Sequence, residues 1–169
     1  MSDERTEGEG PRIYTVGHST RSINEFLDLL KSYGISVVVD VRRWPTSRKH
    51  PWFNREELEK ALERRGIRYV WLGELLGGYR EGGYESYMAT ESYRRGIEKL
   101  LETVRRADGP VAIMCSEKLW FRCHRRFISD TLTSLGYKVI HILDVGRAQP
   151  HPGRARYTSS STSSELSET

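Results

Sequence analysis

The chain has 169 residues, of which 37% are hydrophobic and 30% are charged, and its formal net charge is +4. This length suits one domain with its own core, and the mild positive charge favours anionic ligands without the large basic excess of a dedicated nucleic-acid binder. No apolar run is long enough to span a membrane, no signal peptide is recognisable and two cysteines are too few for a disulfide scaffold, so we expect a soluble cytoplasmic protein without a membrane partner.

Both ends of the chain are polar and lack a periodic apolar pattern. The first ten residues hold four acids, and from Thr158 onward nine of twelve residues are serine or threonine. Such compositions bury too little apolar surface to fold. We therefore expect a disordered lead over residues 1–11, one α/β domain over 12–146 and a disordered Ser/Thr-rich tail over 147–169.

The first part of the domain has the pattern of a strand, a helix and a second strand. A strand is expected at 12–16, followed by a helix that begins with a capping box of Ser22 and Glu25 and ends at Gly34. The run ISVVVDV at 35–41 is apolar without alternation, as is typical of a central parallel strand covered on both faces.

A second helix and a third strand follow. The helix is predicted from Asn54 to Gly66, and the strand IRYVWL occupies residues 67–72. Five glycines then fall within residues 73–83. They predict either a mobile flap or a set of simple turns.

The remaining pattern is helix, strand, helix and strand. A helix is expected at 91–107, a fourth strand at 111–115 and a fifth at 138–143. The helix between the last two strands ends at Gly136, and its apolar face is predicted to consist of Phe121, His124, Ile128, Leu132 and Leu135. Alternating strands and helices imply right-handed crossovers. We predict a mainly parallel five-stranded sheet with helices on both faces.

Polar and reactive residues gather where these strands end. Open α/β sheets bind their ligands at the carboxyl ends of the strands. The residues that follow the first, second and fourth strands include His18, Ser19, Arg21, Asp40, Arg42, Arg48, Cys115, Glu117, Arg122, Cys123, His124 and Arg125. This concentration at one edge predicts a functional site there.

Several of these segments resemble known families. VVVDVR at 37–42, and VAIMC at 111–115 with the later LGYKV, resemble the DVR strand and the active-site strand and exit of rhodaneses. A larger set of motifs resembles the domain-of-unknown-function family numbered 488, whose members are uncharacterised. That set is YTVGHSTRS at 14–22, VDVRRWPTSR at 39–48, LGELLGG at 72–78, CSE at 115–117 and CHRRFISD at 123–130. The rhodanese resemblance implies a rhodanese-like arrangement with Cys115 as nucleophile.

The first functional hypothesis is a cysteine-centred enzyme that transfers a sulfur, phosphoryl or acyl group. A thiol at a strand end, facing a helix N-terminus, has a lowered pKa. Cys115 would be the nucleophile, and His18 and Glu117 complete the candidate catalytic set, although the Glu117 carboxylate opposes thiolate formation. Six residues without a glycine separate Cys115 from Arg122, which makes a tight anion nest difficult to form. Cys115 as a buried structural thiol is the alternative.

Guanidinium groups are suited to a small anionic substrate or a nucleotide. The candidate substrate-binding residues are Ser19, Arg21, Arg42, Arg48, Arg122 and Arg125. Solvated surface arginines are the rival interpretation, and we expect Asp40 to form a structural ion pair with a nearby arginine.

No cofactor is expected, with one alternative to consider. Cys115, Cys123, His124 and His18 have the right ligand types for zinc, but they lack the usual short spacing. His124 also suits a packed position. Cys115 and Cys123 could form a redox pair only if the intervening loop folds back far enough to bring the thiols together.

The second hypothesis is a binding module for a nucleotide or a nucleic acid. Trp44, Trp52 and Trp120 lie in loops at the same sheet edge, where indole rings can stack on bases or cover the core. In this case the arginines would hold phosphates and the cysteines would be structural or metal-linked. The standard glycine-rich nucleotide motifs are missing.

Overall fold

Six strands form one sheet in the computed structural model, which describes residues 11–153. The strands are β1 (Arg12–Gly17), β2 (Val37–Asp40), β3 (Arg68–Trp71), β4 (Val111–Cys115), β5 (Lys138–Asp144) and β6 (Arg147–Pro150). Their order is β3-β2-β4-β1-β5-β6, in which the first five strands are parallel and β6 runs antiparallel to β5. The predicted mainly parallel sheet of an α/β domain is confirmed, but the predicted number of strands, five, is one too low.

The additional strand lies in a segment that we expected to be tail. All four residues of β6, RAQP, are exposed, and the strand ends in a proline, which is tolerated on an edge strand. Its pairing with β5 brings the next residue, His151, into a buried position. Residues 1–10 and 154–169, which make up most of the expected lead and tail, lie outside the described residues.

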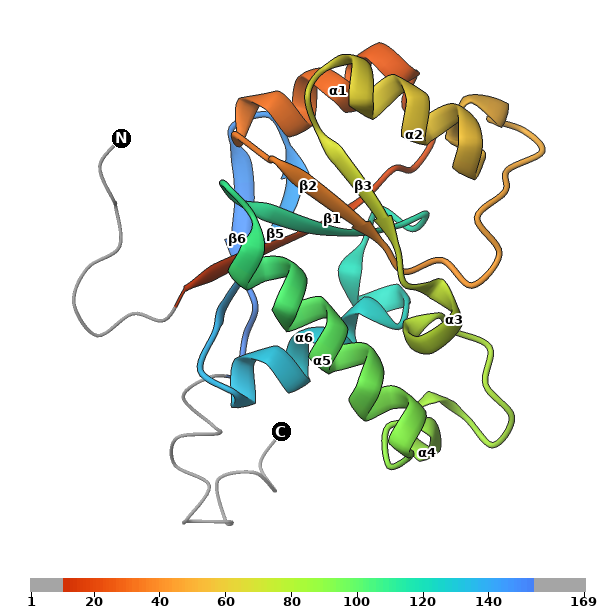
Figure 1. Ribbon diagram of the computed structural model, residues 1–169, viewed down its shortest axis with the longest axis vertical. Coiled ribbons are helices and arrows are strands. Elements are labelled where there is room, and N and C mark those ends of the chain that lie inside the picture. Colours follow the sequence, from red (N-terminus) through yellow and green to blue (C-terminus); the bar gives the residue numbers. More distant parts are fainter. Residues whose placement is uncertain (1–10, 154–169) are drawn as a thin grey trace.

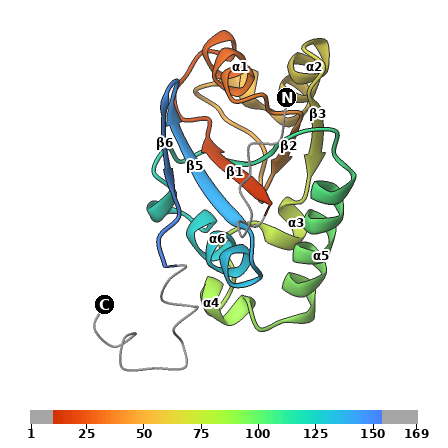
Figure 2. The ribbon, with the colours of Figure 1, turned by 90° about the vertical axis from the view of Figure 1, so that its left-hand side faces the viewer.

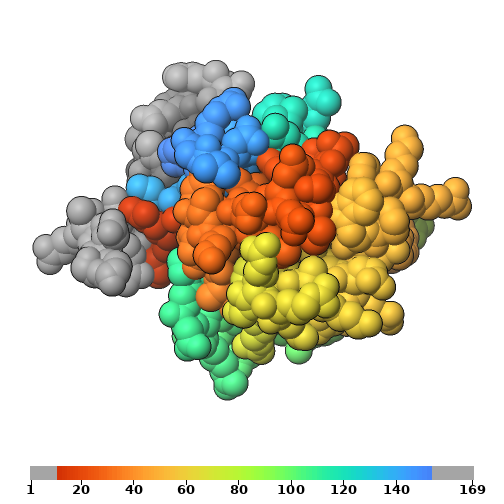
Figure 3. All heavy atoms as spheres, turned by 90° about the horizontal axis from the view of Figure 1, so that it is seen from above, coloured from red at the N-terminus to blue at the C-terminus, as the bar shows by residue number. Residues whose placement is uncertain are grey.

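Helices cover both faces of the sheet, as predicted. They are α1 (Ile23–Ser32), α2 (Arg55–Arg64), α3 (Gly73–Leu76), α4 (Tyr84–Tyr87), α5 (Glu91–Arg106) and α6 (Arg125–Ser134). Helices α1 and α2 lie on one face, and α5 and α6 lie on the other (Figures 1 and 2). Figure 3 looks onto the first face, where the segments of α1 and α2 lie side by side. Two apolar core layers result, one on each side of the sheet.

Local signals in the sequence account for where α1 begins. The Glu25 amide donates to the Ser22 hydroxyl at 3.1 Å, and the Ser22 amide donates to the Glu25 carboxylate at 2.8 Å. This is the predicted capping box, which satisfies two amides at the helix start. The buried side of α1 then carries Phe26, Leu27 and Leu30.

The glycine-rich segment after β3 turns the chain around the short helices α3 and α4. Gly83 precedes α4 with a φ of 94°, a conformation that favours glycine. Arg80 holds the segment together by donating to the carbonyls of Gly77 and Glu74 at 2.8 and 2.6 Å, and its guanidinium lies over the Tyr87 ring. Gly82 and Gly83 both have a positive φ in these turns, and the alternative of a mobile flap stays a prediction.

Helix α6 begins later than the apolar pattern predicted. A 3-10 turn at Trp120–Arg122 and an extended Cys123 precede it, and Arg125 is its first residue. Phe121 therefore lies outside the helix and is about half exposed, and Leu135 follows its end and is also exposed. The correct buried face of α6 includes Arg125, Ile128 and Leu132, so a charged residue occupies a position on the apolar stripe.

No helix within residues 11–153 is long and apolar enough to cross a membrane.

Candidate active site

The carboxyl ends of three neighbouring strands are joined by main-chain hydrogen bonds. Beyond the end of β1, the His18 and Ser19 amides donate to the carbonyls of Cys115 and Ser116, each at 2.9 Å. Beyond β2, the Val41 amide donates to the Met114 carbonyl, also at 2.9 Å. These bonds bring the polar segments after β1, β2 and β4 to one edge of the sheet.

A cleft of about 400 Å³ opens at this edge. It is lined by Arg42, Arg43, Trp44, Thr46, Gly78, Tyr79, Cys115, Ser116, Glu117, Arg122, Cys123 and His124. The predicted site residues Arg42, Cys115, Glu117, Arg122, Cys123 and His124 are thus brought together. The cleft also contains Trp44 and Tyr79, two exposed aromatic residues whose rings contact each other.

Both cysteines of the chain meet at the base of this cleft. The loop after β4 folds back so that the sulfur atoms of Cys115 and Cys123 lie 3.0 Å apart. Cys115 is buried, and its sulfur is 3.5 Å from the Glu117 carbonyl oxygen, whereas Cys123 is more accessible and accepts the Arg125 amide at 3.3 Å. The condition that we set for a redox pair, a loop that brings the thiols together, is therefore met.

The surroundings of the two thiols shift their pKa values in opposite directions. Burial, followed by the contact with Cys123, raises the pKa of Cys115. The hydrogen bond between the two sulfurs lowers the pKa of Cys123 and outweighs the opposing effect of burial, and the positive charge of Arg125 also lowers this pKa. Both shifts favour Cys123 over Cys115 as the thiolate of the pair.

Arg125 is the charged group that lies against this pair. Its side chain is fully buried and donates to the Thr15 hydroxyl at 2.9 Å and to the carbonyls of Glu117 and Lys118 at 2.5 and 3.1 Å. Burial alone would lower its pKa, but the neighbouring sulfurs outweigh this and raise the pKa. Its buried Nε has no hydrogen-bond partner in the described structure.

His18 belongs to a buried network behind the cleft. Its Nδ1 lies 2.9 Å from the Ser19 carbonyl and must donate, and its Nε2 lies 3.4 Å from Arg42 and accepts. Its ring stacks on Phe53, and burial lowers its pKa to about 4. His18 is thus neutral, with both nitrogens engaged away from the cysteines. It is not among the residues that line the cleft.

Asp40 and Arg42 form the structural ion pair that we predicted for Asp40. The guanidinium donates to both carboxylate oxygens at 2.9 and 2.8 Å, and Tyr69 adds a third donor at 2.5 Å. Asp40 and Arg42 are both buried. Arg42 therefore faces the cleft with its charge already paired.

His124 lines the cleft with one defined tautomer. Its Nε2 lies 2.9 Å from the Val41 carbonyl, so this nitrogen carries the proton and donates. Burial lowers the pKa of His124, which keeps the ring neutral. The other ring nitrogen of His124, Nδ1, faces Gly78 and carries no proton, so it is a hydrogen-bond acceptor.

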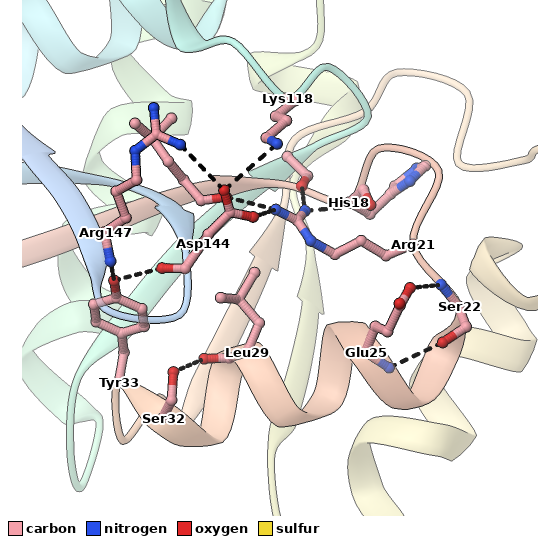
Figure 4. Close-up of polar contacts among 12 residues, drawn as sticks. His18, Arg21, Ser22, Glu25, Leu29, Ser32, Tyr33, Lys118, Asp144 and Arg147 are labelled. Carbon is pink, nitrogen blue, oxygen red and sulfur yellow. Dashed lines mark hydrogen bonds and ion pairs between the residues drawn. The ribbon is translucent and has the colours of Figure 1, made fainter.

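Three other predicted anion-binding residues lie away from the cysteines. Arg21 donates to the Gly17 and Leu143 carbonyls at 2.6 and 2.7 Å and reaches Asp144 at 3.4 Å, so it ties the end of β1 to the end of β5 (Figure 4). Ser19 lines a separate hollow beside Arg21. Arg48 is exposed and is not part of the cleft lining.

The loop tryptophans have different roles. Trp52 donates its indole N–H to the Arg21 carbonyl at 2.9 Å, and Trp120 stacks on His141 with ring centroids 4.5 Å apart. Both are therefore packing residues. Trp44 is 60% exposed at the mouth of the cleft.

The His, Cys, Asp and Glu side chains around the cleft offer little to a metal ion. Within residues 11–153, no three His, Cys, Asp or Glu side chains are grouped so that they could hold one. His18 engages both ring nitrogens with Ser19 and Arg42, so it does not join the two sulfurs as a ligand.

Two parts of this site were missed from the sequence. We treated Arg125 as a candidate anion-binding residue, but it lies at the i, i+3, i+7 spacing of the buried residues Ile128 and Leu132, and that spacing was the available signal of its burial. His141 is buried on β5, and no local pattern indicates its contact with His151 at 2.9 Å.

Comparison with known proteins identifies the family. The family model described as "Domain of unknown function DUF488" matches residues 22–132, which include β2, β4 and both cysteines. No curated protein and no solved structure matches the chain. The rhodanese-like arrangement therefore stays a prediction. Because the matched segment covers well over half of the sequence, the chain belongs to the DUF488 family.

Proposed function

We propose that the protein is a thiol-dependent enzyme in which Cys123 is the reactive thiolate and Cys115 is the resolving thiol. This changes the roles that we expected from the sequence, where Cys115 was the nucleophile. The substrate class is a small, negatively charged compound with an electrophilic sulfur, such as a disulfide. It would bind in the cleft above the two cysteines.

The burial of Arg125 is the observation that carries the proposal. A fully buried guanidinium normally has a carboxylate partner, because an unpaired charge in the interior is costly. Within the described residues Arg125 has no such ion pair, and its oxygen partners are all uncharged. The ionisable groups that act on it are the two cysteines. A thiolate is therefore the natural counter-charge of Arg125.

The second thiol favours sulfur chemistry over phosphoryl or acyl transfer. A sulfur-bound intermediate on Cys123 can be displaced by a neighbouring thiol to give a disulfide. The two sulfurs already lie 3.0 Å apart, and a disulfide requires them to approach by about 1 Å. A phosphoryl or acyl group on Cys123 would gain nothing comparable from this contact.

The proposed reaction has two balanced steps. The Cys123 thiolate attacks one sulfur of a disulfide R–S–S–R′, so that a Cys123–S–S–R bond forms and R′–S⁻ leaves. Cys115 then attacks the Cys123 sulfur, R–S⁻ leaves and takes up the Cys115 proton, and a Cys115–Cys123 disulfide remains. Two electrons pass from the protein to the substrate. In the cytoplasm, the location that we propose, cellular thiols would return the protein to its dithiol form.

The cleft supplies groups that suit an anionic substrate. Arg122 is exposed and lines the cleft, and so does Arg43, whose guanidinium lies over the Trp44 ring at 5.3 Å from the ring centroid. The free Nδ1 of His124 offers a hydrogen-bond acceptor on the same wall. Arg42 contributes less, since Asp40 already neutralises it.

A trapping experiment tests the assignment of the two thiols. The reduced full-length protein and its Cys115→Ser and Cys123→Ser variants are treated with oxidised glutathione and followed by intact mass. We expect the wild type to lose two hydrogens as its internal disulfide forms. The Cys115→Ser variant should accumulate a mixed disulfide, and Cys123→Ser should react at least tenfold more slowly because its remaining thiol is buried and protonated. Equal, slow reaction of both variants would overturn the proposal.

A further inference from the structure

A line of hydrogen bonds runs from Arg125 through the interior to the surface. Arg125 donates to the Thr15 hydroxyl at 2.9 Å, and that hydroxyl lies 2.6 Å from Nδ1 of His141. Nε2 of His141 lies 2.9 Å from Nδ1 of His151, and Nε2 of His151 lies 2.7 Å from the Asp130 carboxylate. We call these four residues, Thr15, His141, His151 and Asp130, the Thr15–Asp130 chain.

The two ends determine the direction of every bond in this chain. A guanidinium only donates, so the Thr15 oxygen accepts from Arg125 and its single proton goes to His141. A carboxylate only accepts, so His151 carries its proton on Nε2 and accepts at Nδ1. His141 then donates from Nε2, which agrees with its neutral state, because burial lowers its pKa to about 2. All four bonds point from the cation towards the anion.

The Thr15–Asp130 chain is enclosed by the side chains of other residues over most of its length. Thr15 and His141 are fully buried, and His151 is 8% exposed. The Trp120 ring stacks on His141 and meets the edge of His151 at a centroid distance of 4.9 Å. The Asp130 carboxylate, which is 38% exposed, is the end that opens to solvent.

We propose that the Thr15–Asp130 chain is a set of positioning residues that holds the Arg125 guanidinium against the cysteine pair and so supports the Cys123 thiolate. The proposal rests on the function proposed above. It extends the working site from the cleft to β5 and to the segment after β6. Thr15, His141 and His151 lie outside the residues matched by the family model.

The buried surroundings of the Thr15–Asp130 chain have low polarity, and this explains how Asp130 at one end can influence Arg125 at the other. Hydrogen bonds that share one direction polarise one another, and they are stronger in a buried setting than in water. Asp130 thereby fixes the direction of all four bonds and anchors the far end of the Thr15–Asp130 chain without contacting Arg125. Thr15 restricts one end of the guanidinium, and the Glu117 and Lys118 carbonyls restrict the other. The charge is thus kept beside Cys123.

The experiment compares isosteric and conservative changes in the full-length protein. Alkylation of Cys123 by iodoacetamide is measured against pH by peptide mass mapping, which gives the midpoint for thiolate formation. The ionisable groups that act most strongly on Cys123 are Cys115, Arg125 and His124, and all of them stay in place. Thr15→Val removes the hydroxyl and keeps the shape, whereas Thr15→Ser keeps the hydroxyl. Asp130→Asn removes the carboxylate charge at the end of the Thr15–Asp130 chain. Asp108→Asn is its control, because Asp108 precedes β4 and so lies at the end of that strand opposite to Cys115.

We expect the midpoint to rise by about one pH unit in Thr15→Val and to return towards the wild-type value in Thr15→Ser. Asp130→Asn should also raise the midpoint, and Asp108→Asn should leave it unchanged. If Thr15→Val does not fold, the partly exposed Asp130 decides the question. A low wild-type midpoint that Asp130→Asn and the folded Thr15 variants all keep would overturn the positioning role. A wild-type midpoint near the free-thiol value of about 8.5 would instead overturn the proposed function itself.

Discussion

Two buried arginines show how single residues decide the chemistry of this protein. Arg42 is paired through two hydrogen bonds with Asp40, so its charge is neutralised within the fold. Arg125 is buried more completely, and within residues 11–153 its guanidinium donates to a hydroxyl and two carbonyls. The same side chain is thus structural at one position and directs its charge at a pair of thiols at the other.

Removing the charge of Arg125 should affect reactivity and stability together. In Arg125→Met, the Cys123 thiolate loses its nearest cation, so alkylation at pH 6 should slow at least tenfold. The carbonyls of Glu117 and Lys118 lose their donor, which should cost about 2–4 kcal/mol of unfolding free energy. Iodoacetamide kinetics and urea denaturation measure the two effects. Arg126→Met is the control. It changes the next residue, an exposed arginine whose guanidinium lies over the Phe127 ring, and should alter neither the alkylation rate nor the stability.

His18 should make the protein less stable in mild acid. Its pKa falls from 6.5 to about 4 on folding, so the unfolded chain binds a proton in this range more readily than the folded one. Its contribution is complete above pH 6.5 and is lost as the pH falls towards 4, by about 2 kcal/mol at pH 5. Urea denaturation at pH 7.5 and pH 5 should show a smaller loss in His18→Asn than in the wild type. An identical loss in both proteins would contradict this assignment.

At the scale of secondary-structure elements, glycines set how closely the site's segments approach. A Cβ added at Gly17, the last residue of β1, would lie 1.8 Å from the Glu117 carbonyl oxygen. At Gly96 of α5, it would lie 2.7 Å from the Leu76 side chain of α3. The loop between the cysteines therefore packs directly on the β1 main chain, and the absence of a side chain at Gly17 permits this.

Gly17→Ala should therefore move the loop that carries Glu117. The new methyl group collides with main chain that cannot rotate away, and we expect a loss of about 3 kcal/mol in unfolding free energy. The displaced loop should also weaken the contact between Cys115 and Cys123, so disulfide formation with oxidised glutathione should slow. Gly109→Ala is the matched control. Its Cβ would meet the Ser36 side chain at 3.4 Å and the Gly34 carbonyl oxygen at 3.9 Å, which are ordinary contacts, so both measurements should stay close to wild type.

At the scale of the whole molecule, the sheet order connects the site to the end of the described chain. β1 lies between β4, which carries Cys115, and β5, which carries His141. β6 pairs with β5 at the edge, and His151 follows it. The His151 amide donates to the Val139 carbonyl at 2.8 Å, so the segment after β6 is held on the sheet.

The domain boundary predicted at residue 146 can be tested by truncation. A chain of residues 11–146 lacks β6 and His151, whereas a chain of residues 11–153 keeps both. Loss of the edge hydrogen bonds and of the His141–His151 contact should lower the melting temperature of the shorter chain by roughly 5–10 °C relative to the longer one. Calorimetry of the two chains measures this difference. Equal melting temperatures would show that β6 contributes little and that residue 146 is an adequate boundary.

Much of the fold follows from local patterns in the sequence. Continuous apolar runs such as VVVD and VAIMC identify buried parallel strands, because a strand covered on both faces excludes polar residues. Ser22 and Glu25 identify a helix start, because both partners of a capping box lie within one turn. The concentration of reactive residues after β4 likewise follows from their positions in the sequence.

The identity of the working groups depends on contacts between distant segments. The 3.0 Å approach of the two sulfurs depends on how the loop after β4 packs on Gly17, and no spacing rule describes that packing. The inward direction of Arg125 depends on where α6 begins, which an irregular turn before it determines. His141 and His151 meet only because β6 pairs with β5. Periodicity reports whether a residue is buried, but burial alone does not specify its partners, because these come from other strands and loops through tertiary packing.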